Sequence, residues 1–148
     1  MWTGAPVPGE LHRMTIDPNT LMARARERLE AAYAPYSRFR VAAAIVDDQG
    51  RVFTGVNVEN ISYGLSMCAE RVAVFTAIAA GSRRISAVAV TSSGADLLSP
   101  CGACRQVLAE FAGPDVAVYC DAPDSPRRWT VAELLPAGFE AAQLGGKR

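Results

Sequence analysis

The order of the predicted elements indicates an α/β domain, a mixed sheet with helices on both faces. After an opening helix, the apolar patterns along the chain follow the order β-β-α-β-α-β. The first two strands read as a hairpin, and residues 85–91 form a β-branched, apolar run typical of a strand buried on both faces. The chain has 148 residues, half of them hydrophobic, which suits one domain with a single sizeable core.

The first half of the chain predicts one helix and one hairpin. A helix is expected over residues 17–33, because Asp-Pro at its start is a capping signal and apolar residues recur at helical spacing. Residues 39–46 and 51–58 are β-compatible stretches joined by the turn sequence Asp-Asp-Gln-Gly. They predict an antiparallel hairpin.

The second half predicts helices alternating with strands. Two longer helices are expected to stop at glycines, Gly81 and Gly113, and a short final helix has Thr130 as its cap. In chain order the helices cover residues 67–80, 101–112 and 130–135, and the strands cover residues 85–91 and 116–119.

Three segments make up the predicted organisation. Residues 1–13 have two prolines, two glycines and no helical or strand period, so they predict a flexible N-terminal extension. Residues 14–140 form a single domain, without a repeat or a low-complexity linker, and residues 141–148 form a C-terminal tail.

Charge and hydropathy exclude several classes of protein. Fifteen basic and fifteen acidic residues give zero net charge with no basic cluster, so no nucleic-acid partner is expected. No apolar run approaches the roughly 20 residues of a membrane span, and the N-terminus lacks the pattern of a secretory signal. Four cysteines in close pairs fit metal ligation in a reducing compartment, so the protein is expected to be cytoplasmic.

Two short motifs supply three thiols and one carboxylate. Cys68 and Glu70 belong to a Cys-Ala-Glu triplet, and Cys101 and Cys104 to a Pro-Cys-Gly-Ala-Cys stretch. Catalytic zinc sites use three protein ligands and leave the fourth position to water. Both motifs open predicted helices, whose N-termini favour thiolates. The pattern predicts a zinc site with an open position and a proton carrier beside it.

Three thiolates around a zinc dication leave a net charge of minus one on the metal and its ligands. Arg71 directly follows Glu70 and is expected to donate hydrogen bonds to the thiolate sulfurs, which would offset part of this charge. The alternative for Arg71 is an ordinary surface arginine near a helix start.

The cysteines admit two other interpretations, a closed structural metal site and a redox pair. Cys120 would be a fourth ligand in a closed structural site, but it ends a strand-like run and is expected to be a buried, unreactive thiol. A redox pair of Cys101 and Cys104 leaves Cys68 and Glu70 unexplained. His12, the only histidine, lies in the extension and is expected to be solvated.

Five collinear stretches now identify a resemblance. They are residues 36–41 (YSRFRV), 54–60 (TGVNVEN), 68–71 (CAER), 100–106 (PCGACRQ) and 133–136 (ELLP). A cysteine or histidine, one residue, glutamate and then Pro-Cys-x-x-Cys is the signature of zinc-dependent nucleobase deaminases. Over residues 16–139 the chain closely resembles the small homotetrameric cytidine deaminases.

The resemblance implies a fold and an activity. The fold is a three-layer α-β-α sandwich around a mixed five-stranded sheet, assembled as a homotetramer with one Zn²⁺ per subunit. The activity is hydrolytic deamination of cytidine and deoxycytidine to uridine and deoxyuridine with release of ammonia, a step of pyrimidine salvage. Two alternatives stay open: the same chemistry on a blasticidin-type aminonucleoside, and a non-catalytic zinc-binding module.

The same resemblance implies the catalytic roles. Cys68, Cys101 and Cys104 hold zinc, whose hydroxide attacks C4 of the cytosine ring. Glu70 carries protons from the water to ring N3 and then to the leaving amine. The backbone N–H of Ala69 is a candidate donor to the ring carbonyl.

Substrate contacts complete the expectation. Asn57 and Glu59 are two apart on a predicted strand, hence on one face, and the resemblance implies that they bind the ribose hydroxyls. A carboxylate at the sugar disfavours a phosphate, which favours a nucleoside over a nucleotide. Phe39 is expected to pack on the base, with ordinary strand core as its alternative, and Phe139 to reach into a neighbouring subunit's site.

Overall fold

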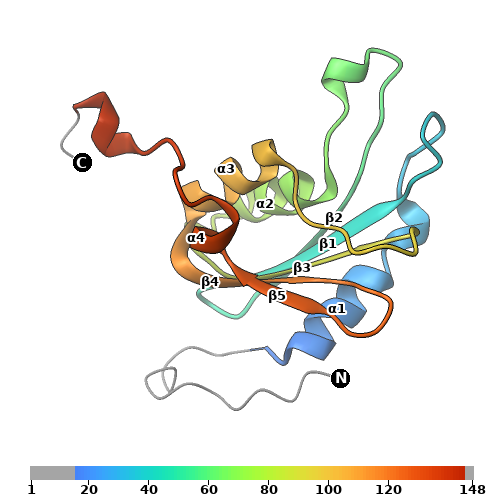
Figure 1. Cartoon of the computed structure of the whole chain (residues 1–148), viewed down its shortest axis with the longest axis horizontal. Helices are drawn as coiled ribbons and strands as arrows, with labels where there is room; N and C mark the ends of the chain where they lie inside the picture. Colours follow the sequence, from blue (N-terminus) through green and yellow to red (C-terminus); the bar gives the residue numbers. More distant parts are fainter. Residues whose placement is uncertain (1–15, 146–148) are drawn as a thin grey trace.

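A five-stranded sheet carries helices on both faces in the computed structural model, which describes residues 16–145 (Figure 1). The strands are β1 (Val41–Asp47), β2 (Val52–Val56), β3 (Ile85–Ser92), β4 (Ala112–Cys120) and β5 (Arg127–Thr130). The helices are α1 (Pro18–Arg26), α2 (Ala69–Ala79), α3 (Gly102–Phe111) and α4 (Val131–Leu134). Short 3-10 turns cover Leu29–Ala31, Tyr63–Leu65 and Ala141–Leu144.

The sheet is mixed, as predicted. Its strand order is β2-β1-β3-β4-β5. The β1–β2 hairpin is antiparallel, β1 is also antiparallel to β3, and β4 is antiparallel to β5. Only β3 and β4 run parallel, and α3 makes the crossover that parallel neighbours require.

Alternation along β1 divides the core into two layers. Ala43 and Ile45 face the helices α2, α3 and α4, whereas Ala44 and Val46 face α1. The α1 layer is closed by three buried side chains of that helix, Leu21, Met22 and Ala25. The three-layer α-β-α arrangement is therefore confirmed.

The prediction for the first helix was too long. α1 begins at its expected cap, Asp17, whose carboxylate accepts the N–H of Thr20, but it ends at Arg26. Tyr33 instead pairs through its backbone, donating to the carbonyl of Asn57 and accepting from Glu59 N–H. A tertiary pairing therefore overrides the local helical period.

Two further boundaries differ from expectation. Gly81 stops α2 with a φ of +96°, as predicted, but Gly113 stops nothing. α3 passes directly into β4 at Ala112, which adopts extended angles, and Gly113 lies within the strand. The strand patterns did not predict β5, because this short edge strand, Arg127–Thr130, has two arginines and only one apolar residue, Trp129.

The chain ends are only partly described. The predicted extension, with His12, lies outside the described residues. Within the predicted tail, Ala141–Leu144 form a 3-10 turn on an arm that projects from the body (Figure 1). Across residues 16–145, no helix has the length and apolar character needed to cross a membrane.

Candidate metal centre and active site

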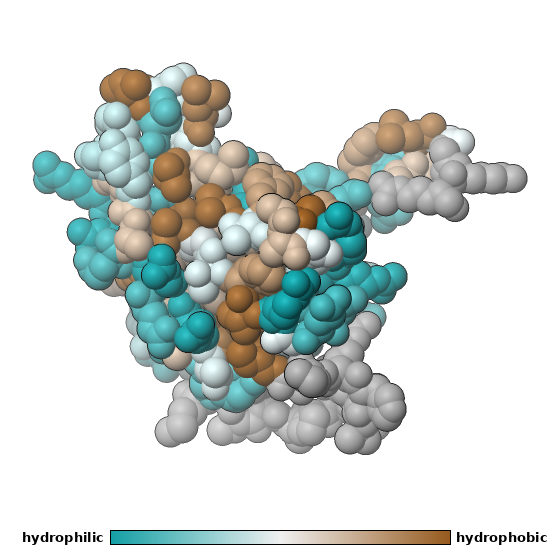
Figure 2. Space-filling view, turned by 180° about the vertical axis from the view of Figure 1, so that it is seen from behind, coloured by the Kyte–Doolittle hydropathy of each residue, from teal (hydrophilic) through white to brown (hydrophobic). Residues whose placement is uncertain are grey.

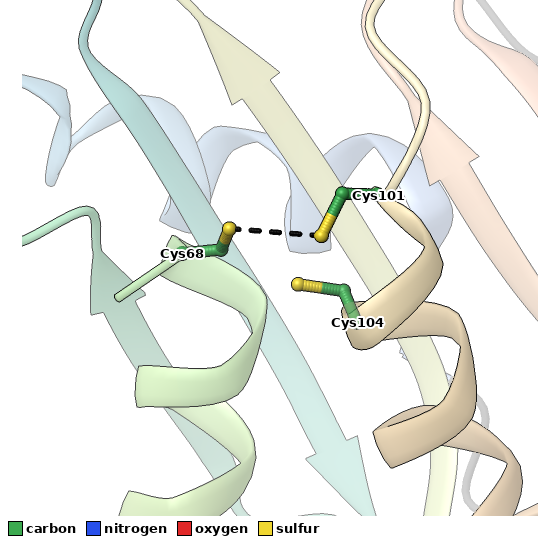
Figure 3. A group of neighbouring side chains, drawn as sticks. All are labelled: Cys68, Cys101 and Cys104. Atoms are coloured by element: carbon green, nitrogen blue, oxygen red, sulfur yellow. Dashed lines mark hydrogen bonds between the residues drawn. The ribbon is translucent and has the colours of Figure 1, made fainter. Parts of the chain in front are cut away.

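Three thiols converge between the N-termini of α2 and α3 (Figure 3). Cys68 is the N-cap of α2, Cys101 is the N-cap of α3, and Cys104 lies in the first turn of α3. Their Sγ atoms all lie within 4.8 Å of one another, and those of Cys68 and Cys101 are 3.8 Å apart.

This spacing fits a tetrahedral zinc ion. Zn–S bonds of about 2.3 Å place two sulfurs of a tetrahedron about 3.8 Å apart. Neither N-cap cysteine uses its side chain to cap its helix, so both sulfurs are available to a metal. Cys104 is fully buried whereas Cys101 is exposed, which leaves one side of the triad open to solvent.

The pKa values of Cys68 and Cys104 are shifted in opposite directions. A hydrogen bond from Cys104 lowers the pKa of Cys68 to about 5, with Arg71 and Cys101 adding to the shift and burial opposing it. The pKa of Cys104 is raised by that same bond and by burial. Cys68 is therefore the first thiolate to form, and a bound metal would take the place of the remaining protons.

Arg71 lies against the triad from the first turn of α2. Its Nη2 donates to Cys68 Sγ at 3.2 Å, as the charge argument expects of it. Its Nε is buried and has no hydrogen-bond partner among the described residues. The guanidinium thus brings positive charge directly to a ligand sulfur.

Glu70 is the buried acid of the site. Glu70 lies in the first turn of α2 and is only 4% exposed. Burial raises the pKa of this carboxyl, and the nearby thiolate of Cys68 raises it further, against the effect of Arg71. A raised pKa suits a group that must both accept and release a proton near neutral pH.

Backbone pairing brings the predicted sugar-binding segment to the metal ligands. Val58 exchanges two backbone hydrogen bonds with Met67, the residue before Cys68. Asn57 and Glu59 flank Val58, just beyond the end of β2 rather than within it. A Cβ on Gly55 would lie 2.4 Å from the carbonyl of Ala69, so β2 packs directly on the start of α2.

Both predicted sugar ligands are held by the segment that leads into β1. Asn57 Oδ1 accepts the N–H of Val41 and its Nδ2 donates to the carbonyl of Phe39, each at 2.8 Å. Glu59 accepts the N–H groups of Tyr36 and Ser37, at 3.0 and 3.1 Å.

The predicted aromatic contacts are both at the surface. Phe39 precedes β1, is 38% exposed, and lies against Gly94, where an added Cβ would come within 2.7 Å of its ring. It is therefore not buried strand core. Phe139 is 60% exposed, and Gln106 clamps its backbone by accepting its N–H and donating to its carbonyl.

Sequence reasoning assigned no role to Arg105, which directly follows a predicted ligand. Its three guanidinium nitrogens donate to the Pro100 carbonyl, the Leu134 carbonyl and Ser99 Oγ. It therefore fixes the loop before Cys101 to the end of α4. The only signal was that it lies in the PCGACRQ stretch.

Two remaining features lie outside the site. Cys120 is buried and does not join the triad, and burial raises its pKa to about 12, as expected of an unreactive thiol. A cavity of about 500 Å³ opens at the opposite end of the sheet, lined by Asp48, Arg84 and Phe111 among others. None of the predicted site residues lines it.

Comparison with known proteins agrees with this geometry. A family model described as "Cytidine and deoxycytidylate deaminase zinc-binding region" matches residues 16–120. Cytidine deaminase of Halalkalibacterium halodurans is 44% identical over 130 residues, 87% of this chain and 98% of that protein. Cytidine deaminase of Mycobacterium tuberculosis is 44% identical over 133 residues, 90% and 97% of the two chains. The crystal structure of cytidine deaminase from Burkholderia pseudomallei superposes with a TM-score of 0.80 at 44% identity, covering 84% of this chain and 100% of that one.

Proposed function

The chain belongs to the cytidine and deoxycytidylate deaminase family, and on that premise we propose that it hydrolyses the C4 amino group of cytidine and deoxycytidine. The products are uridine or deoxyuridine and ammonia. One observation carries the proposal: three thiols converge on one point at two helix N-termini, with a buried carboxyl two residues from the first thiol.

Cys68, Cys101 and Cys104 would hold the zinc. When bound there, zinc supplies a water acidic enough to lose its proton near neutral pH. Three sulfur ligands carry more negative charge than the ion carries positive charge, and this weakens its pull on the water. Arg71 and the two helix N-termini offset part of that excess.

Glu70 is the proton carrier of the reaction. It accepts a proton from the attacking water and delivers it to ring N3; it then accepts the proton of the new C4 hydroxyl and gives it to the amine that leaves from C4. A single carboxyl can perform these transfers in turn because its raised pKa favours taking up a proton that it later releases. Its burial also keeps bulk water from competing for the proton.

Asn57 and Glu59 would bind the sugar. The pairing of Val58 with Met67 supports this assignment, because it brings the backbone on either side of Val58 close to Cys68, the first metal ligand. The pKa of Glu59 is lowered, chiefly by the hydroxyl and N–H of Ser37, so its carboxylate is an acceptor for sugar hydroxyls. The same negative charge disfavours a phosphate and so favours a nucleoside.

The base would lie between the metal and Phe39. The exposed ring of Phe39 offers a face for the pyrimidine. Ala69 is the first residue of α2, where backbone N–H groups have no partner within the helix, so its N–H is free to donate to the ring carbonyl.

A homotetramer would complete the site. Apolar surface gathers at the tip of the protruding loop between β2 and α2 and on the C-terminal arm (Figure 2). Ile61, Leu65 and Leu144 are each at least 69% exposed, as expected of residues that contact another subunit. Phe139, clamped at the base of that arm, would reach a neighbouring subunit's substrate.

A substrate panel tests the proposal. Turnover of cytidine, deoxycytidine, cytidine monophosphate and blasticidin S is followed by absorbance, with zinc measured in the same preparation and mass measured by light scattering. We expect one zinc per chain, a tetramer, and preference for the two nucleosides. Preference for the monophosphate or for blasticidin S would overturn the substrate assignment, and zinc without any turnover would indicate a structural module.

A further inference from the structure

One serine hydroxyl connects two of the predicted substrate residues. Ser37 Oγ donates a short hydrogen bond to one carboxylate oxygen of Glu59, Oε2. The same Oγ accepts the backbone N–H of Phe39 at 3.0 Å. Because a hydroxyl has a single proton, accepting from Phe39 leaves that proton directed at Glu59.

The other carboxylate oxygen is held separately. Glu59 Oε1 accepts the backbone N–H groups of Tyr36 and Ser37. The carboxylate is thus fixed at both oxygens by one short segment of chain. Within residues 16–145, Ser37 contributes the one side chain that hydrogen-bonds to Glu59, so this is the contact that a substitution can remove.

The backbone of this segment is itself constrained. Arg38, between Ser37 and Phe39, has a φ of +58°, the left-handed region that a residue with a side chain seldom adopts. Asn57 closes the segment from the other side by bonding the backbone of Phe39 and Val41. The orientation of Glu59 is therefore built into the fold before any substrate arrives.

We propose that Ser37 is a positioning residue for substrate recognition: its hydroxyl holds the Glu59 carboxylate in the orientation that receives the sugar hydroxyls. This inference rests on the proposed sugar-binding role of Glu59. Ser37 itself need not touch the substrate. Without the Ser37 hydroxyl, Glu59 Oε2 loses its side-chain donor, and the carboxylate is held only at Oε1. Part of the free energy of substrate binding is then spent on ordering the Glu59 carboxylate.

The consequence is specific to the sugar. A nucleoside that offers hydroxyls to Glu59 benefits from the ordered carboxylate, whereas one without them does not. Ser37 should therefore affect cytidine strongly and 2′,3′-dideoxycytidine little. A merely structural role for Ser37 would affect both alike.

The test compares Ser37→Ala with the unsubstituted enzyme on these two nucleosides. We expect kcat/KM to fall about tenfold for cytidine, the scale of one hydrogen bond to a charged group, and to change less than about twofold for 2′,3′-dideoxycytidine. Ser37→Thr, which keeps the hydroxyl, should restore most of the cytidine activity. Ser93→Ala is the matched control, because Ser93 Oγ accepts the N–H of Arg40 in the same segment, whereas Glu59 bonds to Tyr36 and Ser37.

A second variant separates the two hypotheses. Glu59→Gln should discriminate the two nucleosides in the same way, and adding Ser37→Ala to it should cost little more, since the two residues act as one unit. If Glu59→Gln discriminates but Ser37→Ala is silent, or penalises both nucleosides equally, the role of Ser37 is overturned and that of Glu59 stands. If Glu59→Gln does not discriminate, both are overturned.

Discussion

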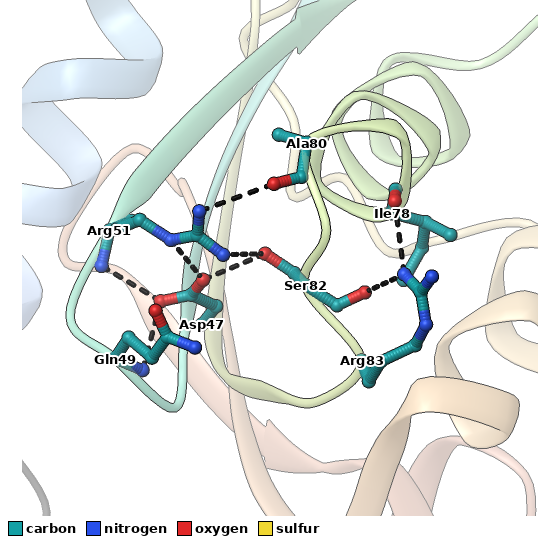
Figure 4. A network of polar contacts seen from close by, with 7 residues as sticks. All are labelled: Asp47, Gln49, Arg51, Ile78, Ala80, Ser82 and Arg83. Carbon is teal, nitrogen blue, oxygen red and sulfur yellow. Dashed lines mark hydrogen bonds and ion pairs between the residues drawn. The ribbon is translucent and has the colours of Figure 1, made fainter.

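The two ends of α2 both carry a polar cluster, but only the cluster at the C-terminal end is closed. There Asp47 is buried and its carboxylate accepts from the N–H groups of Gln49 and Arg51, from Arg51 Nε and from Ser82 Oγ (Figure 4). Arg51 also reaches the carbonyl of Ala80 at the end of the helix. Both carboxylate oxygens of this cluster have partners within the chain.

At the N-terminal end one buried polar atom is left without a partner among the described residues, and three thiols face one another. Arg71 has a buried Nε with no partner among the described residues, and Cys68 does not cap the helix with its side chain. Burial raises the pKa of Glu70. Buried polar groups are normally satisfied, so an unpartnered guanidinium nitrogen beside three convergent thiols indicates a site made for a ligand.

The contrast separates what holds the fold from what performs the chemistry. The closed cluster ties the β1–β2 turn to the end of α2 and should contribute to stability alone. The open cluster should contribute to metal binding and turnover. Substitutions at each end test that division.

The largest effect is expected from Cys104→Ser. Loss of the buried ligand should prevent zinc from copurifying and lower kcat by at least about a thousandfold, since the activated water is lost. Zinc content and turnover are measured on the same sample. Cys120→Ala is the matched control, a buried thiol outside the triad, and equal zinc loss in both variants would contradict the assignment of ligands.

Substitution in the closed cluster at the C-terminal end of α2 should change stability but not zinc content or turnover. Asp47→Ala should lower the free energy of unfolding by about 3 kcal/mol, because it leaves Arg51 and Ser82 without their buried partner. Zinc content and kcat per folded molecule should stay unchanged. Denaturant unfolding measures the first, and exposed Asp48→Ala is the control, with an effect below about 0.5 kcal/mol.

The contribution of the Asp47 carboxylate to stability should depend on pH. Burial favours a higher pKa for Asp47, but hydrogen bonds from Ser82, Arg51 and Gln49 outweigh it and hold the pKa below its ordinary value. Its stabilising contribution is therefore present above about pH 4 and is lost as the pH falls through the folded-state pKa. The difference in the free energy of unfolding between the unsubstituted protein and Asp47→Ala should therefore narrow as the pH falls below about 4. A difference that widens would show that the pKa of Asp47 is raised rather than lowered.

A smaller effect on catalysis is expected from Arg71→Ala. Removing the hydrogen bond to Cys68 leaves more negative charge on the ligands, so kcat should fall about tenfold while zinc stays bound. Arg71→Lys keeps the positive charge but not the forked donors of the guanidinium. Its kcat should lie between those of Arg71→Ala and the unsubstituted enzyme. Unchanged kinetics in Arg71→Ala would remove this residue from the account.

The smallest effect is expected from Gln106→Ala. Loss of both bonds to the backbone of Phe139 should loosen the arm and raise the KM for cytidine about fivefold with kcat unchanged. Gln143→Ala, which removes a similar bond within the arm, is the control. Equal KM values for Gln106→Ala and the unsubstituted enzyme would argue against a contact between Phe139 and substrate.

Strongly patterned elements could be predicted from the chain, and weakly patterned ones could not. The β-branched run of β3 and the apolar run of α2 determine their own structure. β5 has two exposed arginines, lies at the sheet edge and has no apolar alternation, so its pairing with β4 rather than its own pattern makes it a strand. α1 ends at Arg26, and Tyr33, which local spacing assigned to the same helix, pairs instead with backbone far along the chain.

The candidate site divides in the same way. The thiols and Glu70 lie within two short motifs, so local spacing predicts which side chains share each helix start, although the fold brings the two motifs together across 33 residues. Ser37, Arg105 and Gln106 find their partners 22, 29 and 33 residues away, and only the folded chain brings them together. Positioning contacts of this kind carry no local signal.

The measurement that tests the central claim most directly is kcat of Glu70→Gln at full zinc occupancy. If the open end of α2 is catalytic, kcat on cytidine should fall about a thousandfold, while zinc content and the unfolding midpoint match those of the unsubstituted protein. A kcat within about tenfold of the unsubstituted enzyme, with zinc bound, would contradict the account, because the buried carboxyl would then have no part in moving protons.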